Sequence, residues 1–424
     1  MASDRSDSSG TLAEPPRNLA LRNFGSVWFI IPQGTGILAL CFWQSHYQFH
    51  GLNSIALVAW ALTIVQLLLV FATYLVRLVR FPRYVATQLA TNNSEVACIA
   101  SFPVVLTSIV QMLGLVLGHQ DGWSTASYVL WWIVFGLSVV IVVIIPQTFA
   151  TTHPPGIDKL LPNSQLPIVA ALTAAAAGGA LCESTSTSLA QQLPVIAVSY
   201  LLVGVGVPLA IFMDAIFLAR LFNQTKEGQQ KENRLQKQML AYQTMICAGP
   251  WGQSSVALLT LGKVVLTGGL GQSAASVVGN ELAARSVAYI SIFVGFLFWG
   301  HATFWWIFTL LSIAHSVAGR AAGSRRIQFQ MPMWSLVFPW GVYTNGAIQL
   351  GKLLDSTVFH VWSAILTILM TIIWLSFTAM TIKGCLDGSI LGLEHGWRSS
   401  PPSNNESDEE HAMSHGRRRW RKEH

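Results

Sequence analysis

The stretch Ile30-Ile31-Pro32-Gln33-Gly34-Thr35-Gly36 interrupts the first long apolar segment of the chain. A proline removes a backbone hydrogen bond from a helix and bends it, and glycine permits a close backbone approach or an irregular turn. In a bilayer, such a break is tolerated only where the freed backbone groups face protein or a water-filled cavity. The stretch therefore predicts either a broken helix whose amides face an anion or a helix that packs through small residues.

A proline recurs in all five odd-numbered apolar segments, whereas among even-numbered segments only the sixth is interrupted in its middle, by Pro208. We interpret the prolines of the odd-numbered segments as helix kinks. Their bias predicts an inner set of bent helices around a conduit and an outer set that shields it, which is the plan of a transporter or channel. The kink prolines are Pro32, Pro103, Pro167, Pro250 and Pro339, of which Pro167 lies near a helix start, where proline costs little.

The composition indicates an all-α polytopic membrane protein. Hydrophobic residues make up 52% of the chain and charged residues only 10%, whereas soluble domains carry about 25% charged residues. A membrane span needs about 20 mostly apolar residues. Ten segments meet this expectation, at 25–43, 54–76, 96–118, 125–146, 165–181, 193–218, 240–261, 287–314, 333–351 and 358–382.

The chain is expected to form one transmembrane domain with polar ends. Residues 25–382 hold the ten predicted spans, and the polar head (1–24) and tail (383–424) have the composition of disordered segments. No cleavable signal peptide is expected, because the first residues lack an apolar core. The five cysteines have no metal-binding spacing, so neither a metal nor another cofactor is predicted.

The basic residues predict the orientation. If both termini are cytosolic, 22 of the 25 basic residues lie on the cytosolic side and only Lys263, Arg285 and Lys352 lie at the outer mouth. The net charge of +6 then gives no reason to expect nucleic acid as a partner, whereas the lipid bilayer is one. The basic run 417–422 either touches anionic lipid or is a solvated tail. Glycosylation of Asn92, Asn223 or Asn405, which head three sequons on the predicted cytosolic side, would contradict this orientation.

Candidate pathway residues lie in the first, seventh and ninth segments. The run Cys247-Ala248-Gly249-Pro250-Trp251-Gly252-Gln253-Ser254-Ser255 is the most polar patch at membrane depth, and it needs either a water-lined site or packed neighbouring helices as hydrogen-bond partners. Phe338 precedes a kink proline and is either aimed at the conduit as a gate or simply packed. The candidate substrate-pathway residues are Gly34, Thr35, Gly36, Gly252, Gln253, Ser254, Ser255 and Asn345.

Few ionisable groups lie at membrane depth. Asp214 is either a proton-coupling residue or a carboxylate tied to a nearby arginine or backbone amide, and His301 is expected to be buried and hydrogen-bonded. The predicted odd-numbered spans contain no acidic residue, so a cation pathway would lack ligands. The sequence contains no Walker-type loop and no Ser-His-Asp arrangement, so we expect neither ATP drive nor an enzyme. A conduit lined by glycine, hydroxyl groups and helix amides suits an anion.

Several stretches resemble the tellurite-resistance and dicarboxylate transporter family, which includes malate permeases, sulfite efflux pumps and plant slow anion channels. Trp28-Phe29, Phe49-His50-Gly51-Leu52-Asn53 and the run 348–356 resemble the malate permease. Tyr128-Val129-Leu130-Trp131-Trp132 and the run 249–255 resemble the sulfite pump. The likeness covers all ten predicted spans, at about 22–385.

The resemblance implies five helical hairpins in quasi-fivefold order, with the odd-numbered helices lining a central pore. It also implies that Phe338 occludes this pore and that the protein assembles as a homotrimer. The expected function is transport of a small anionic substrate at the plasma membrane, with malate or another small dicarboxylate first, sulfite export second and a passive anion channel third. We expect no counterpart of the long regulatory tails of the plant channel.

Overall fold

A computed structural model describes residues 15–153, 156, 160–223, 234–267, 280–318 and 329–393. They fall into two compact units, of which the larger is Phe24–Met380. The smaller unit contains helix α1 (Pro16–Asn23) and the short helix η8 (Ser389–Leu391), joined by a hydrogen bond of 2.9 Å from Asn23 Nδ2 to the Leu391 carbonyl oxygen. Helix α1 lies within the predicted head, and the domain boundaries stay predictions. The segments 1–14 and 394–424, with Asn405 and the basic run 417–422, lie outside the described residues.

The described residues form helices and no strand. Eight helical segments are long and apolar enough to cross a membrane, judged by length and composition. Two further helices, α12 (Ala248–Thr267) and α14 (Val337–Leu354), cover the seventh and ninth predicted spans and carry the polar candidate residues. The eight segments are Ser26–Gln44, Leu52–Arg80, Asn93–Leu117, Gly122–Thr151, Pro162–Ser184, Leu189–Phe222, Glu281–Ala318 and Thr357–Leu386.

Five helices of the larger unit form a closed inner ring. They contact one another in the cyclic order α2 (Ile30–Gln44), α6 (Ser101–Leu117), α8 (Leu166–Ser184), α12, α14 and back to α2. In the most apolar 18-residue stretches of the segments that include α2, α6 and α8, 78% to 100% of the residues are buried. Helix α8 is the alanine-rich fifth segment, and a Cβ added at its Gly179 would lie 2.3 Å from Thr260 Oγ1 of α12. Small residues thus let the ring helices approach closely.

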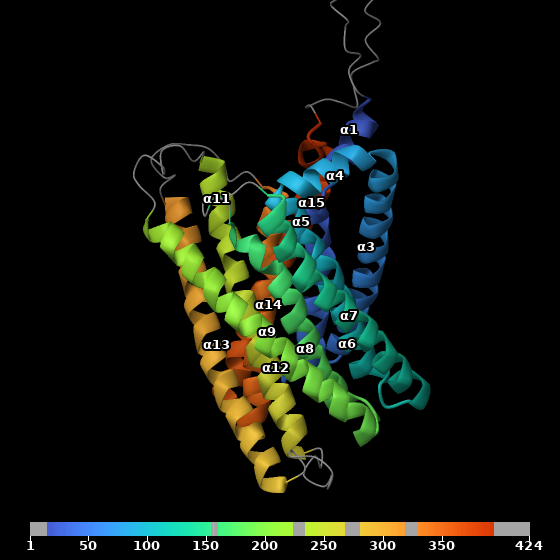
Figure 1. The fold of residues 1–424 in the computed structure, drawn as a ribbon, viewed down its shortest axis with the longest axis vertical. Coiled ribbons are helices and arrows are strands. Elements are labelled where there is room, and N and C mark those ends of the chain that lie inside the picture. The colour runs from blue at the N-terminus through green and yellow to red at the C-terminus, as the bar shows by residue number, and fades with distance from the viewer. Residues whose placement is uncertain are drawn as a thin grey trace, which may run out of the picture. The chain divides into compact units, whose positions relative to one another are not determined.

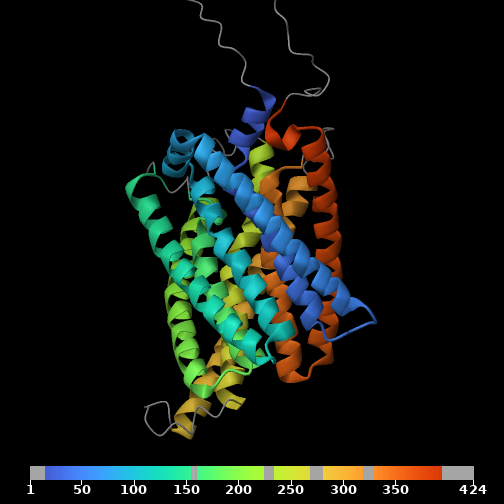
Figure 2. The same cartoon turned by 90° about the vertical axis from the view of Figure 1, so that its right-hand side faces the viewer.

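Five longer helices flank the ring: α3 (Leu52–Arg80), α7 (Asp121–Thr151), α9 (Leu189–Phe222), α13 (Glu281–Ala318) and α15 (Thr357–Leu386) (Figures 1 and 2). In the corresponding stretches of these five helices, only 22% to 39% of the residues are buried. Each of the first four contacts the ring helix before it and the next one along the ring. Helix α15 does the same through hydrogen bonds of 3.0 Å, from Trp340 Nε1 to the Leu366 carbonyl oxygen and from Trp374 Nε1 to Thr35 Oγ1.

The ring prolines lie in the first turns of their α-helices. Short 3₁₀ segments precede four of these helices: η1 (Ser26–Phe29), η3 (Pro162–Gln165), η4 (Thr244–Cys247) and η7 (Met331–Leu336). Helix α5 (Asn93–Ile99) precedes the fifth. Proline fits a first turn, where no intrahelical donor is lost. The backbone therefore stays helical through each junction and only the helix type or the first turn changes there. Prolines further inside a helix occur in the outer helices, at Pro146, Pro194 and Pro208.

Two shorter helices, α4 (Pro82–Thr91) and α11 (Arg234–Gln243), complete the larger unit. The first turns of the ring helices gather at one end of the ring, since α2, α8 and α14 each contribute their first residues to a single cavity there. We call this the amino end of the ring. The last turns of α2, α6 and α14 meet at the opposite, carboxyl end.

Candidate functional site

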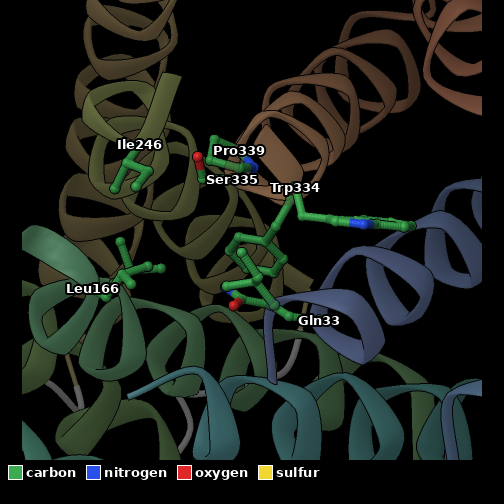
Figure 3. A pocket seen from close by; sticks show the side chains of 9 residues that line it. Gln33, Leu166, Ile246, Trp334, Ser335 and Pro339 are labelled. Carbon is green, nitrogen blue, oxygen red and sulfur yellow. The ribbon is translucent and has the colours of Figure 1, made fainter. Parts of the chain in front are cut away.

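A narrow cavity lies at the amino end of the ring, beside Phe338. Its volume is about 10 Å³, which is the lower limit for a single water molecule. Phe338 is only 3% exposed, and its side chain is one of the nine that line this cavity. Figure 3 shows Leu166 and Ile246 on one side of the cavity and Gln33 and Trp334 on the other. We call this the amino-end cavity; Ile30, Gln33, Leu166, Val169, Ile246, Trp334, Ser335, Phe338 and Pro339 line it.

Gln33 is the polar residue that sequence reasoning missed at this cavity. It is 1% exposed, and its Oε1 atom has no hydrogen-bond partner. Buried polar groups are usually paired because an unpaired one costs free energy. Gln33 lies between Pro32 and Gly34 in the stretch that predicted the break, and this position was the available signal.

The predicted hydroxyl donors are already engaged with backbone carbonyls. Ser254 Oγ donates to the Pro250 carbonyl oxygen at 2.7 Å, and Ser255 Oγ donates to that of Gly295 at 2.8 Å. Thr35 Oγ1 donates to the carbonyl oxygen four residues before it and accepts the Trp374 indole N–H. These residues line neither of the two cavities described here. In this conformation the hydroxyl groups of Ser255 and Thr35 connect two helices, and that of Ser254 bonds within its own helix.

The predicted pathway glycines allow close packing between ring helices. An added Cβ at Gly34 would lie 3.0 Å from Val337 of α14, and one at Gly36 would lie 2.9 Å from Ser108 of α6. At Gly252 it would lie 2.8 Å from a methyl carbon of Val342. All three glycines lie within regular α-helix. This arrangement matches the small-residue packing that the first stretch also allowed.

The two remaining pathway candidates are both buried amides. Gln253 lies in α12, and Asn345 lies in α14. Asn345 Oδ1 accepts a hydrogen bond of 3.3 Å from Gln349 Nε2, which also donates to Gln44 Oε1 at 2.6 Å. A row of three amide side chains therefore runs along α14 and α2 towards the carboxyl end of the ring.

Asp214 is held by neutral donors. Its carboxylate is 5% exposed and accepts hydrogen bonds from Gln165 Nε2 at 2.7 Å, Trp251 Nε1 at 2.6 Å and Trp305 Nε1 at 2.8 Å. His301 Nε2 lies 3.4 Å away, but its side chain is 42% exposed, so the expectation that His301 is buried is wrong. The prediction of a tie to a nearby arginine or backbone amide did not anticipate these partners. The cluster joins α9 to η3, α12 and α13, and Asp214 lines neither cavity.

A second buried carboxylate was missed because Glu95 lies one residue before the predicted third span. It accepts from Arg77 Nη1 at 2.5 Å, from Tyr74 Oη at 3.3 Å and from the Ser26 backbone N–H at 3.1 Å. Arg77 and Glu95 form a buried ion pair. The pair joins the end of α3 to α5 and to η1, which starts the first ring helix.

A wider cavity of about 350 Å³ lies at the carboxyl end of the ring. Of the three basic residues predicted at the outer mouth, only Lys352 lines it. Lys263 pairs with Glu183 at 2.5 Å, and Arg285 pairs with Glu281 at 2.6 Å. We call this the carboxyl-end cavity; Trp43, Gln44, Ser45, Gln48, Asn53, Leu115 and Lys352 line it. Among the described residues, no group of three or more His, Cys, Asp or Glu is placed to hold a metal ion.

Comparison with known proteins identifies the family. Residues 23–382 match the family described as voltage-dependent anion channel, SLAC1. The chain belongs to the SLAC1 family. This match confirms the resemblance expected from the residues, and it covers the ring, the outer helices and both cavities.

Curated relatives of this SLAC1-family chain are transport proteins of fungi. The chain is 27% identical over 376 residues to the sulfite efflux pump SSU1 of Arthroderma benhamiae, covering 87% of this chain and 92% of the relative. The sulfite efflux pump SSU1 of Trichophyton rubrum matches with the same identity and coverage. The malic acid transport protein of Schizosaccharomyces pombe is 22% identical over 374 residues, which cover 88% of this chain and 80% of that protein.

Proposed function

We propose that this protein is an integral membrane transporter that moves small anions along the axis of its five-helix ring. The closed cyclic contact of five buried helices carries this proposal, because such a ring offers a path shielded from lipid. In the proposed arrangement, ten helices cross the membrane as five hairpins around a central pore. The polarity of α12 and α14 is compatible with this arrangement, since ring helices contact protein rather than lipid.

We propose Phe338 as the gate of this pore. Its side chain lies at the amino-end cavity, where the space holds at most about one water molecule. An anion with three or more oxygen atoms is larger than water, so it passes only if the aromatic ring of Phe338 moves. The 3₁₀ segment η7 ends two residues before Phe338, and we propose this change of helix type as the place of the movement.

Sulfite is the first substrate to test. The sequence-based expectation placed malate first, but identity to the sulfite efflux pumps is 27% against 22% to the malic acid transport protein. The run 249–255, which resembles the sulfite pump, forms the first turns of a ring helix. Malate stays the second candidate because its relative also matches most of the chain.

The membrane potential sets the favoured direction. Moving an anion into a cell with an inside-negative potential costs about 2.3 kcal/mol per charge per 100 mV, and export gains the same amount. Export therefore needs no coupled ion. We propose Asp214 as an anchor of the ring rather than as a proton carrier, because it accepts three hydrogen bonds and lines neither cavity.

Orientation, location and assembly complete the proposal. We place the amino end of the ring and both termini in the cytosol because the basic residues favour that side. The plasma membrane is the proposed location, and a homotrimer with one pore in each protomer is the proposed assembly. Both follow from the resemblance to the family.

Flux into proteoliposomes tests the function. The purified full chain is reconstituted, and uptake of labelled sulfite and labelled malate is measured at several pH values against protein-free liposomes. We expect sulfite flux to exceed the protein-free rate and to exceed malate flux. Equal rates with and without protein for both anions would overturn the proposal. Electrical currents at channel-like turnover would instead identify a passive anion channel.

A further inference from the structure

We infer that the carboxyl-end cavity is a binding site for a small oxyanion, held by the ammonium group of Lys352 and the side-chain amide of Gln44. This inference deepens the proposed function and rests on it for the choice of ligand. The cavity has a volume of about 350 Å³, which is enough for a small anion with some of its water. The amino-end cavity is too small for such a ligand.

Lys352 supplies the charge. In the described part of the chain, no carboxylate forms an ion pair with it and no hydrogen bond to it is present. The charged groups that act on it most are Glu183 and Lys263, and these two already pair with each other at 2.5 Å. The positive charge of Lys352 therefore remains available to a ligand in the cavity.

Gln44 supplies the directed donor. The residue is 7% exposed, and its Oε1 atom is occupied by a hydrogen bond from Gln349. That bond assigns Nε2 as the free end of the amide, and this buried atom has no hydrogen-bond partner. A buried N–H donor without a partner costs free energy. An oxyanion in the cavity that Gln44 lines would remove this cost once a small rotation of the side chain uncovers Nε2.

The site leads inward along the amide row. Gln349 connects Gln44 to Asn345, which lies one turn further along α14 towards the amino end. Carboxamide groups hydrogen-bond a passing anion but do not trap it as a second cation would. Lys352, the one cation among the described residues that line this cavity, and the amides beyond it therefore describe a capture site followed by a weaker path.

Lys352 also has a structural alternative. It lies in the last turn of α14, where a cation complements the partial negative charge of the helix carboxyl end. This role predicts a loss of stability on substitution but no change in anion binding. The test must therefore measure binding itself.

Tryptophan fluorescence provides that measurement, because Trp43 lines the cavity. The purified full chain is titrated with sodium sulfate and, separately, with sodium malate. Trp43→Phe identifies the part of the signal that comes from the cavity. We expect Lys352→Gln to raise the Kd for sulfate about tenfold or more, Gln44→Leu to raise it at least about threefold, and Lys352→Arg to keep it. Arg285→Gln, which removes an exposed arginine paired with Glu281 on α13, should leave it unchanged.

Three results would overturn the site: a response to sodium chloride at matched ionic strength equal to that for sulfate, equal Kd values for Lys352→Gln and Arg285→Gln, or a signal that persists in Trp43→Phe. Flux separates this inference from the proposed function. Binding that depends on Lys352 without any anion flux contradicts transport but keeps the site. Flux whose KM is unchanged in Lys352→Gln, together with unchanged binding, contradicts the site but keeps transport.

Discussion

The two ends of the ring differ in space and in charge. At the amino end, the cavity of about 10 Å³ is lined mostly by apolar side chains, and two buried carboxylates, Glu95 and Asp214, hold the starts of the ring helices. At the carboxyl end, five of the seven residues that line the cavity of about 350 Å³ are polar or charged, and the nearby ion pair Glu183–Lys263 is partly exposed. The charged groups that hold the amino end together are thus buried, whereas those near the carboxyl end are partly exposed to solvent.

This difference separates two tasks. A closed, apolar constriction excludes water and ions when the segments around it are held firmly, and buried charges with fixed partners provide such holding. An open mouth needs charge that a ligand can reach, which a buried ion pair would not supply. The comparison therefore predicts large energetic effects at the amino end and small ones at the carboxyl end.

Arg77→Met should give the largest loss of stability. It leaves the buried carboxylate of Glu95 without its cation, which costs about 3–5 kcal/mol. The effect is measured by heating the purified protein and monitoring the fraction that stays monodisperse. The matched control is the double variant Arg77→Met, Glu95→Gln, which should recover part of the loss. A single variant as stable as the parent would contradict the anchor.

Phe338→Ala should give the largest gain of flux. Removing the aromatic ring of Phe338 opens the amino-end cavity. We therefore expect anion flux to rise about tenfold or more, which corresponds to a barrier lower by about 1.4 kcal/mol. Phe217→Ala is the matched control, because Phe217 of α9 is equally buried at 3% exposure but lines neither cavity. Unchanged or lower flux in a folded Phe338→Ala protein would show that the ring only packs.

Asp214→Asn should have an intermediate effect. The amide places an N–H₂ group among the donors of Gln165, Trp251 and Trp305, and losing one buried hydrogen bond costs about 1–3 kcal/mol. Flux measured from pH 5 to pH 8 should keep the pH profile of the parent. If the variant folds and its flux loses all dependence on pH, Asp214 carries a coupled proton and the anchor role is wrong.

Lys263→Gln should have the smallest effect. The pair with Glu183 is partly exposed, and such pairs contribute about 0–1 kcal/mol. The unfolding temperature should therefore stay close to that of the parent. A loss as large as that of Arg77→Met would remove the distinction between the two ends.

Much of the architecture was predictable because the residue types within one segment indicate whether that segment packs against protein or faces lipid. The alanine-rich segment 168–181 predicted a crowded central helix, and α8 is the most buried of the eight apolar segments. Lys352 was predicted at a mouth and lines a cavity there. Phe338 was predicted beside a passage and lines the narrow cavity, although its role as a gate is still a prediction.

Other features depend on contacts that one sequence does not reveal. The partners of Asp214 come from three different elements, 37 to 91 residues away. Ser254 and Ser255 were predicted as donors to a substrate, but residue type does not tell which way a hydroxyl points on a helix. The prolines were read as helix kinks, and that they lie in first turns was expected only for Pro167, because the short helical segments before the ring helices have no clear sequence signal.

The contact between α14 and α2 has a consequence for biosynthesis. Gln349 bonds to Gln44 across 305 residues, and Cys41 contacts the Gly341 carbonyl across 300 residues. The ring can therefore close only after the ribosome has delivered almost the whole chain, and until then the unpaired flank of α2 must be sheltered by lipid or by the insertion machinery. A product truncated before residue 337 would keep its first helices but would lack a sealed wall, so quality control can recognise incomplete chains by that gap.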